Sequence, residues 1–112
     1  MCYWPSEDLK TWNDSRNDCL VNNSQLLVIQ DKEEMEFIKQ ITRGTDVYWI
    51  GLSLSSSDNK WMWVTDAQYD ENIFDRPKDT QRNSCGTIKD KINSDKCSAE
   101  LRWICQKEAI LL

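Results

Sequence analysis

Hydrophobic residues are concentrated in short blocks separated by polar stretches. The strongest block, residues 48–54, is apolar at almost every position, which predicts a central strand covered on both faces. Gly51 interrupts this block where close backbone approach or a bulge would crowd a side chain. Trp61 and Trp63 lie two residues apart, so they are predicted to project from one face of a second strand. We expect these clustered aromatic residues to form core.

Two segments have helical patterns and polar caps. Thr11, with Asp14 three residues later, predicts a helix start, and the polar residues 22–24 predict its end. Its predicted inner side carries Trp12, Ser15, Cys19 and Leu20. Asp31 and Glu34 predict the start of a second helix, and Gly44 is expected to take its left-handed cap position. The predicted buried stripe of this helix comprises Met35, Phe37, Ile38 and Ile41.

The remaining blocks predict short strands at residues 2–4, 26–29, 85–92 and 102–106, with a turn at residues 93–95. Residues 66–84 are long, polar and without regular periodicity, yet they contain Tyr69, Ile73 and Phe74. Such a stretch predicts an ordered, functional loop folded on the domain. Because the helices come early and most strands late, we expect an α+β fold with an antiparallel sheet. The 112 residues fit one domain, residues 1–112.

Composition narrows the classes of function. The net charge of -5 argues against a nucleic-acid partner, because nucleic-acid binding depends largely on neutralising phosphates. The chain has no histidine and thus lacks the usual general base. No pattern places a base beside a nucleophile, so we predict no enzymatic activity. No hydrophobic run approaches a membrane helix in length, and no cleavable signal sequence is present, so any anchor is expected outside these residues.

Five cysteines remain: Cys2, Cys19, Cys85, Cys97 and Cys105. None forms a Cys-x-x-Cys pair, which argues against a structural zinc site. Wide spacing in a small domain favours disulfides and an oxidising compartment. Any four cysteines can pair in three ways, and spacing does not choose among them. The fifth has no partner within the chain.

The order of these landmarks is informative. A helix carrying Cys19 and a second capped helix precede Trp-Ile-Gly-Leu at 49–52 and Trp-Met-Trp-Val at 61–64; the long loop, Cys85, Cys97 and Trp-Ile-Cys at 103–105 follow. This resembles a C-type-lectin-like domain. Residues 2–4, 26–29, 83–85 and 102–107 make it most similar to the killer-cell lectin-like receptors of natural killer cells, particularly the F subfamily. The resemblance implies two helices packed on antiparallel sheets with a long loop, stapled by disulfides.

The resemblance also implies a cysteine pairing and a cellular location. Cys19 is expected to pair with Cys105, and Cys85 with Cys97. Cys2 matches the second cysteine of an N-terminal hairpin whose first cysteine lies upstream, so it is expected to be unpaired in a fragment with a truncated hairpin. The related receptors are type II single-pass proteins of the cell membrane with this domain extracellular, and a homodimer formed through the missing stalk is possible by analogy.

Sugar-binding relatives hold calcium with a Glu-Pro-Asn or Gln-Pro-Asp triplet and a later Trp-Asn-Asp. Here Pro77 is flanked by Arg76 and Lys78, and the later motif is Ile-Asn-Ser at 92–94, in which Asn93 alone survives. Cations in place of oxygen ligands repel calcium, so we predict no metal and no cofactor. A cation site built from loop acids stays open as an alternative. It would draw on Asp70, Glu71, Asp75 and Asp79.

The resemblance therefore predicts an extracellular receptor domain that recognises a cell-surface protein, itself C-type-lectin-like, without calcium. The alternatives are a calcium-dependent carbohydrate-binding lectin and a soluble C-type-lectin-like ligand. In the long loop, predicted apolar contacts are Tyr69, Ile73 and Phe74, predicted basic contacts are Arg76, Lys78 and Arg82, and the predicted polar rim is Asp70, Glu71 and Asp75. In an alternative interpretation, Ile73 and Phe74 plug the loop onto its own core. Asn13 and Asn22 begin N-glycosylation sequons.

Overall fold

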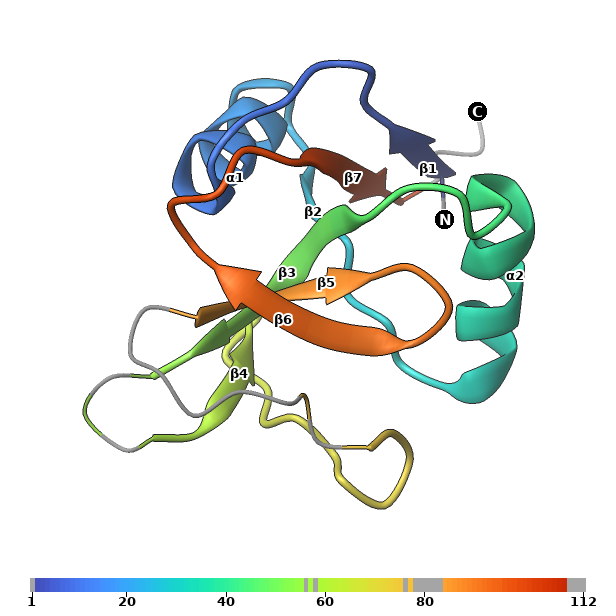
Figure 1. The fold of residues 1–112 in the computed structure, drawn as a ribbon, viewed down its shortest axis with the longest axis vertical. Coiled ribbons are helices and arrows are strands. Elements are labelled where there is room, and N and C mark those ends of the chain that lie inside the picture. Colours follow the sequence, from blue (N-terminus) through green and yellow to red (C-terminus); the bar gives the residue numbers. More distant parts are fainter. Residues whose placement is uncertain (1, 56, 58, 76, 78–83, 109–112) are drawn as a thin grey trace.

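The computed structural model describes residues 2–55, 57, 59–75, 77 and 84–108. Figure 1 shows the helices and the strands of an α+β fold, as predicted. In chain order the elements are β1 (Cys2–Pro5), α1 (Trp12–Val21), β2 (Gln25–Leu26), α2 (Lys32–Thr42), β3 (Tyr48–Leu54), β4 (Trp61–Trp63), β5 (Ser84–Ile88), β6 (Ile92–Lys96) and β7 (Arg102–Lys107).

The strands form one connected sheet in the order β1-β7-β3-β5-β6, with β2 paired to β7 and β4 paired to β3. All these pairs are antiparallel except β3 with β7, where Tyr48 lies opposite Arg102 and Trp49 opposite Trp103. The predicted antiparallel arrangement therefore holds for every described pair except this one. In Figure 1, β4 and the loop after it lie at the end of the molecule opposite β1 and β7.

Gly51 is crowded by backbone, as predicted. A Cβ atom there would lie 2.9 Å from the carbonyl oxygen of Leu26 and 2.9 Å from the Cγ2 atom of Val64. The register between β3 and β5 also shifts between Trp49 and Ser53, so both expected causes are present. A larger residue at position 51 would push β3 away from the segment that follows β2.

Both helix starts are confirmed. The Thr11 side chain accepts a hydrogen bond from the backbone N–H of Asp14 at 3.3 Å, and Asp31 Oδ1 accepts one from Glu34 at 2.8 Å. Each bond satisfies a backbone donor that has no partner within its helix. In α1, Trp12, Ser15 and Cys19 are buried as predicted.

Three details of the helices differ from the predictions. Leu20 and Phe37 are 53% and 49% exposed, because each lies on the outer side of its helix. Phe37 packs instead on Tyr3 of β1, with ring centroids 5.6 Å apart. The left-handed conformation at the end of α2 begins one residue early, at Arg43, and continues through Gly44.

Two strand predictions are also corrected. Residues 27–29 are buried but lie outside β2, and the backbone N–H of Val28 donates to the side-chain oxygen of Gln106 at 3.0 Å. Residues 93–95 belong to β6, and the turn lies at residues 89–91. β6 is last in the strand order and is therefore an edge strand. Edge strands tolerate polar side chains, so the polar composition of β6 resembles that of a turn.

The disulfide pairing implied by the resemblance is confirmed. Cys19 of α1 is bonded to Cys105 of β7, and Cys85 of β5 is bonded to Cys97, just after β6. Cys2 is exposed and free. The first bond lies in a buried cluster with Trp12, Trp49 and Trp103, so it joins helix and sheet within the core.

Candidate functional site: the loop after β4

The first part of the long loop folds back on β4. The backbone N–H of Trp63 donates to the carbonyl of Ala67 at 2.9 Å, and that of Tyr69 donates to the carbonyl of Trp61 at 3.1 Å. Asp66 takes a positive φ of 70° at the reversal. The described part of the loop is therefore ordered against the domain, as the sequence predicted.

Two aromatic side chains hold the loop on the core. Tyr69 and Phe74 are only 8% and 7% exposed, and the Tyr69 ring centroid lies 5.9 Å from that of Trp63 and 6.2 Å from that of Phe74. Both rings are therefore largely covered by the domain, as the interpretation that Phe74 plugs the loop onto the core predicts. Burial raises the pKa of the Tyr69 phenol, and the charges of Asp75 and Glu71 add to that rise.

A tight turn joins these two rings. The carbonyl of Asp70 accepts from the backbone N–H of Ile73 at 3.1 Å and of Phe74 at 3.2 Å, while Asp70 Oδ1 accepts from that of Asn72 at 2.9 Å. Residues 70–75 thus form a ridge, and we use this term for them below. The ridge exposes Asp70, Glu71, Asn72 and Asp75 and leaves Ile73 half-buried.

The structure describes six of the nine predicted contact residues: five belong to the ridge, and Tyr69 directly precedes it. Arg76, Lys78 and Arg82 fall outside the described residues, as does the candidate cation ligand Asp79. Pro77 is described and buried. The candidate site is therefore defined by acidic, amide and aliphatic side chains.

A first hollow of about 580 Å³ lies on the β4 side of the ridge, between Lys60, Trp61 and residues 68–72. Trp61 is 3% exposed, and its indole Nε1–H finds no acceptor among the described residues. A buried donor without a partner carries a desolvation cost. Most of the hollow is lined by the polar side chains of residues 68 and 70–72.

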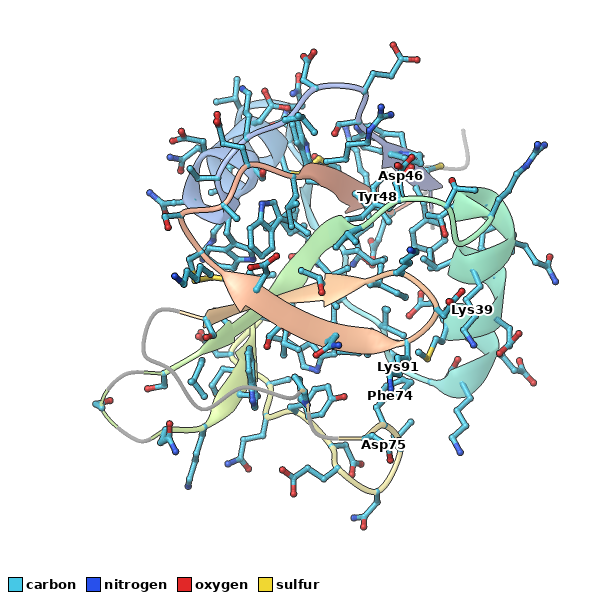
Figure 2. The ribbon with its side chains drawn as sticks, viewed as in Figure 1. Lys39, Asp46, Tyr48, Phe74, Asp75 and Lys91 are labelled. Atoms are coloured by element: carbon cyan, nitrogen blue, oxygen red, sulfur yellow. A yellow bond between two sulfur atoms is a disulfide. The ribbon has the colours of Figure 1, made fainter. Side chains whose placement is uncertain are left out.

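A second hollow of about 270 Å³, here called the α2 groove, lies between α2, the end of the ridge and the turn between β5 and β6 (Figure 2). Its apolar lining comprises Met35, Ile73, Phe74 and Ile92. Its charged lining comprises Lys32, Glu36, Lys39, Asp75 and Lys91. Sequence reasoning identified only the ridge residues of this groove, because the others come from two segments with no shared motif.

The remaining candidates lie away from the ridge. Asn93, the surviving calcium-ligand type, is half-buried in β6 and its Oδ1 accepts from the backbone N–H of Ser94 at 3.0 Å. The described residues contain no group of three or more side chains suited to holding a metal ion. Asn13 and Asn22 are exposed on α1 and at its C-cap. No described helix is both long and apolar enough to cross a membrane.

The comparisons with known sequences identify a single family. The model of the Lectin C-type domain matches residues 8–107. Killer cell lectin-like receptor subfamily F member 1 of Macaca fascicularis is 42% identical over 94% of this chain and 46% of its own length. Subfamily B member 1B allele B of Rattus norvegicus is 38% identical over 96% of this chain and 49% of its own length, and human subfamily F member 2 is 37% identical over 98% and 54%. The chain thus spans about half the length of these relatives.

Solved structures agree with the fold. The carbohydrate-recognition domain of the mouse scavenger receptor C-type lectin superposes with a TM-score of 0.83, at 26% identity, over 99% of this chain and 91% of that one. A trimeric Kupffer cell C-type lectin receptor gives a TM-score of 0.81 at 23% identity over 96% and 78% of the two chains. The second likeness shows the fold alone.

Proposed function

The chain belongs to the Lectin C-type domain family, and we propose that it is the extracellular ligand-binding domain of a natural killer cell receptor that recognises a cell-surface protein without calcium. The relatives that support this are killer cell lectin-like receptors. By analogy with them, the ligand is another C-type-lectin-like protein and the full receptor is a type II single-pass membrane protein.

The observation that carries the proposal is the ridge. Buried Tyr69 and Phe74 hold it in place, so its exposed side chains are presented without a large cost of ordering on binding. Ile73 offers an apolar contact among the exposed acids Asp70, Glu71 and Asp75. This mixture of a central apolar group with a polar rim is typical of protein interfaces.

The chemistry of the family's calcium ligands supports independence from calcium. Arg76 and Lys78 replace the oxygen ligands on either side of Pro77, and a guanidinium or an ammonium group cannot coordinate a hard cation. The side-chain oxygen of Asn93 is already hydrogen-bonded to the next residue. The side chains at positions 76, 78 and 93 therefore do not suit a calcium ion. We assign the binding contacts to the ridge instead.

A cell-binding assay tests the proposal. A fluorescent tetramer of the domain is applied to cells displaying single C-type-lectin-like proteins, in EDTA and again in calcium. We expect staining of one member of the panel in both buffers, and roughly a tenfold weaker affinity for the Ile73→Ala/Asp75→Ala variant, as expected for the loss of about 1.4 kcal/mol of contacts.

The matched control is Glu7→Ala, an exposed acid in the segment between β1 and α1. Its staining should equal that of the wild type. Staining that appears only in calcium and is competed by free sugar would assign the domain to the carbohydrate-binding alternative and contradict the proposal.

A further inference from the structure

Three lysines and two carboxylates, Glu36 and Asp75, line the α2 groove, so its lining carries a net positive charge on a chain whose net charge is -5. Lys32 and Lys39 line it from α2 and Lys91 from the turn between β5 and β6; Figure 2 labels Lys39, Lys91 and Phe74, one from each of the three segments that line the groove. Lys39 pairs with Glu36 at 3.3 Å. Neither Lys32 nor Lys91 has a carboxylate within ion-pair distance among the described residues.

The floor between these cations is apolar. Phe74 and Ile92 are 7% and 5% exposed and form its base, while Met35 and Ile73 are partly exposed on its sides. Burying a further apolar group here removes hydrophobic surface from water on both partners, which is favourable at roughly 25 cal/mol for each Å².

The size of the groove limits the occupant. Pockets for small-molecule ligands usually enclose about 300–1,000 Å³. The α2 groove measures about 270 Å³, at the lower edge of this range, so it has room for one large side chain presented by a protein. Lys32 and Lys91 are complementary to carboxylates on either side of that side chain. Such carboxylates would fix the orientation of the ligand and raise its association rate.

We infer that the α2 groove receives a large aliphatic or aromatic side chain, flanked by acidic residues, from the protein ligand. The inference rests on the proposed function for the identity of the occupant as a protein. It extends the contact surface from the ridge to α2 and to the turn between β5 and β6, and it gives the ligand a chemical signature, an acidic segment with one apolar residue at its centre.

The test uses an acetylated, amidated peptide of sequence Glu-Glu-Leu-Glu-Glu, titrated into the isotopically labelled domain and followed by nuclear magnetic resonance. We expect shifts of the backbone amides of residues 32–39, 73–75 and 91–92. A peptide with glycine in place of leucine should bind several-fold more weakly, and one with lysine in place of every glutamate should not bind. Absence of shifts at these residues would overturn the inference.

Charge reversal supplies the matched variants. Lys32→Glu/Lys91→Glu should weaken peptide binding at least tenfold, whereas Lys96→Glu/Lys107→Glu, at exposed positions outside the groove, should change it less than twofold. Equal losses in the two variants would show a response to net charge alone and overturn the site. Decanoate is titrated in the same way as a lipid-like anion. If decanoate binds the groove as strongly as the peptide, the inference of a protein occupant is overturned.

The experiments distinguish a failure of the groove inference from a failure of the proposed receptor function. Wild-type staining of cells that survives Lys32→Glu/Lys91→Glu unchanged would remove the groove from the interface and leave the ridge in place. Absence of calcium-independent staining by the wild type would overturn the receptor function, whereas the peptide titration would still report on the groove.

Discussion

The hydroxyl of Tyr69 donates a 2.6 Å hydrogen bond to the backbone carbonyl of Asp75, six residues further along the chain. The bond closes the ridge from the inside, because the phenol is buried while the residues it spans are largely exposed. One interior side chain therefore fixes the conformation of the surface that we assign to ligand binding.

Tyr69→Phe should lower the free energy of unfolding by about 1–2 kcal/mol, because it leaves the Asp75 carbonyl without its partner. Urea unfolding gives the loss, and hydrogen exchange should show faster opening of the amides of residues 71–75. Tyr48→Phe is the control, since the buried Tyr48 has no hydroxyl hydrogen bond among the described residues. Equal losses in both variants would contradict a specific role for the bond.

Alkaline pH should weaken the fold. Burial raises the pKa of both Tyr3 and Tyr69, and for Tyr3 the hydrogen bond to Glu34 adds to the rise. A phenol whose pKa is raised by folding contributes stability fully below its unfolded pKa, about 10, and this stability is lost as the pH rises above that value. Urea unfolding from neutral pH to about pH 11 should show the decline, with a smaller decline in Tyr3→Phe/Tyr69→Phe. Parallel pH profiles would refute the linkage.

Trp61→Phe and Trp12→Phe remove the same atoms but should differ in cost. Trp12 Nε1–H donates to the carbonyl of Ile50 at 2.8 Å, so its replacement leaves a buried acceptor unpaired. Trp61 Nε1–H has no acceptor among the described residues, so its removal relieves a penalty. We expect Trp12→Phe to be more destabilising than Trp61→Phe by about 1–3 kcal/mol in thermal or urea unfolding. Equal costs would mean that the Trp61 indole is satisfied in solution.

The two disulfides should contribute unequally. Cys19 and Cys105 are 86 residues apart and Cys85 and Cys97 are 12 apart. In the chain-entropy model, Cys19→Ala/Cys105→Ala should cost roughly 4–5 kcal/mol and Cys85→Ala/Cys97→Ala roughly 3 kcal/mol. Cys2→Ala is the control and should have little effect, because Cys2 is exposed and free. A larger loss from the short link would show that strand geometry, rather than loop closure, dominates.

Calcium should leave the thermal midpoint of the oxidised domain unchanged relative to EDTA. A native-state ligand at about a hundred times its dissociation constant adds about 2.7 kcal/mol, or roughly 10 °C for a domain of this size. The variant Arg76→Glu/Lys78→Asn has the sequence Glu-Pro-Asn at residues 76–78. We expect calcium to raise the thermal midpoint of this variant more than that of the wild type. A rise in the wild type would instead mean that Asn93 and the loop acids form a site.

The sequence predicted features that depend on neighbouring residues. The apolar run of β3, the crowding at Gly51 and the caps at Thr11 and Asp31 each follow from side-chain chemistry within a few positions. The disulfide pairing depended on the family resemblance, because spacing alone left the alternatives open.

Features set by distant contacts were not predicted. Residues 93–95 have turn composition but lie in β6 because they pair with β5, with Asn93 opposite Thr87. Phe37 fits the inner stripe of α2 by spacing, yet it lies outward against Tyr3. The α2 groove brings Lys32, Ile73 and Lys91 together from three separate segments, and no local pattern contains that information.

The pairing of β1 with β7 determines how the domain would respond to mechanical load. Cys2 lies opposite Lys107 in antiparallel neighbours, so tension applied through these two residues opens the hydrogen bonds one after another rather than all at once. Strand separation stops at the disulfide between Cys19 and Cys105, because this covalent bond then carries the force between α1 and β7. Force therefore extends the chain outside that bond first, whereas the residues between Cys19 and Cys105, which include the ridge, are not loaded directly.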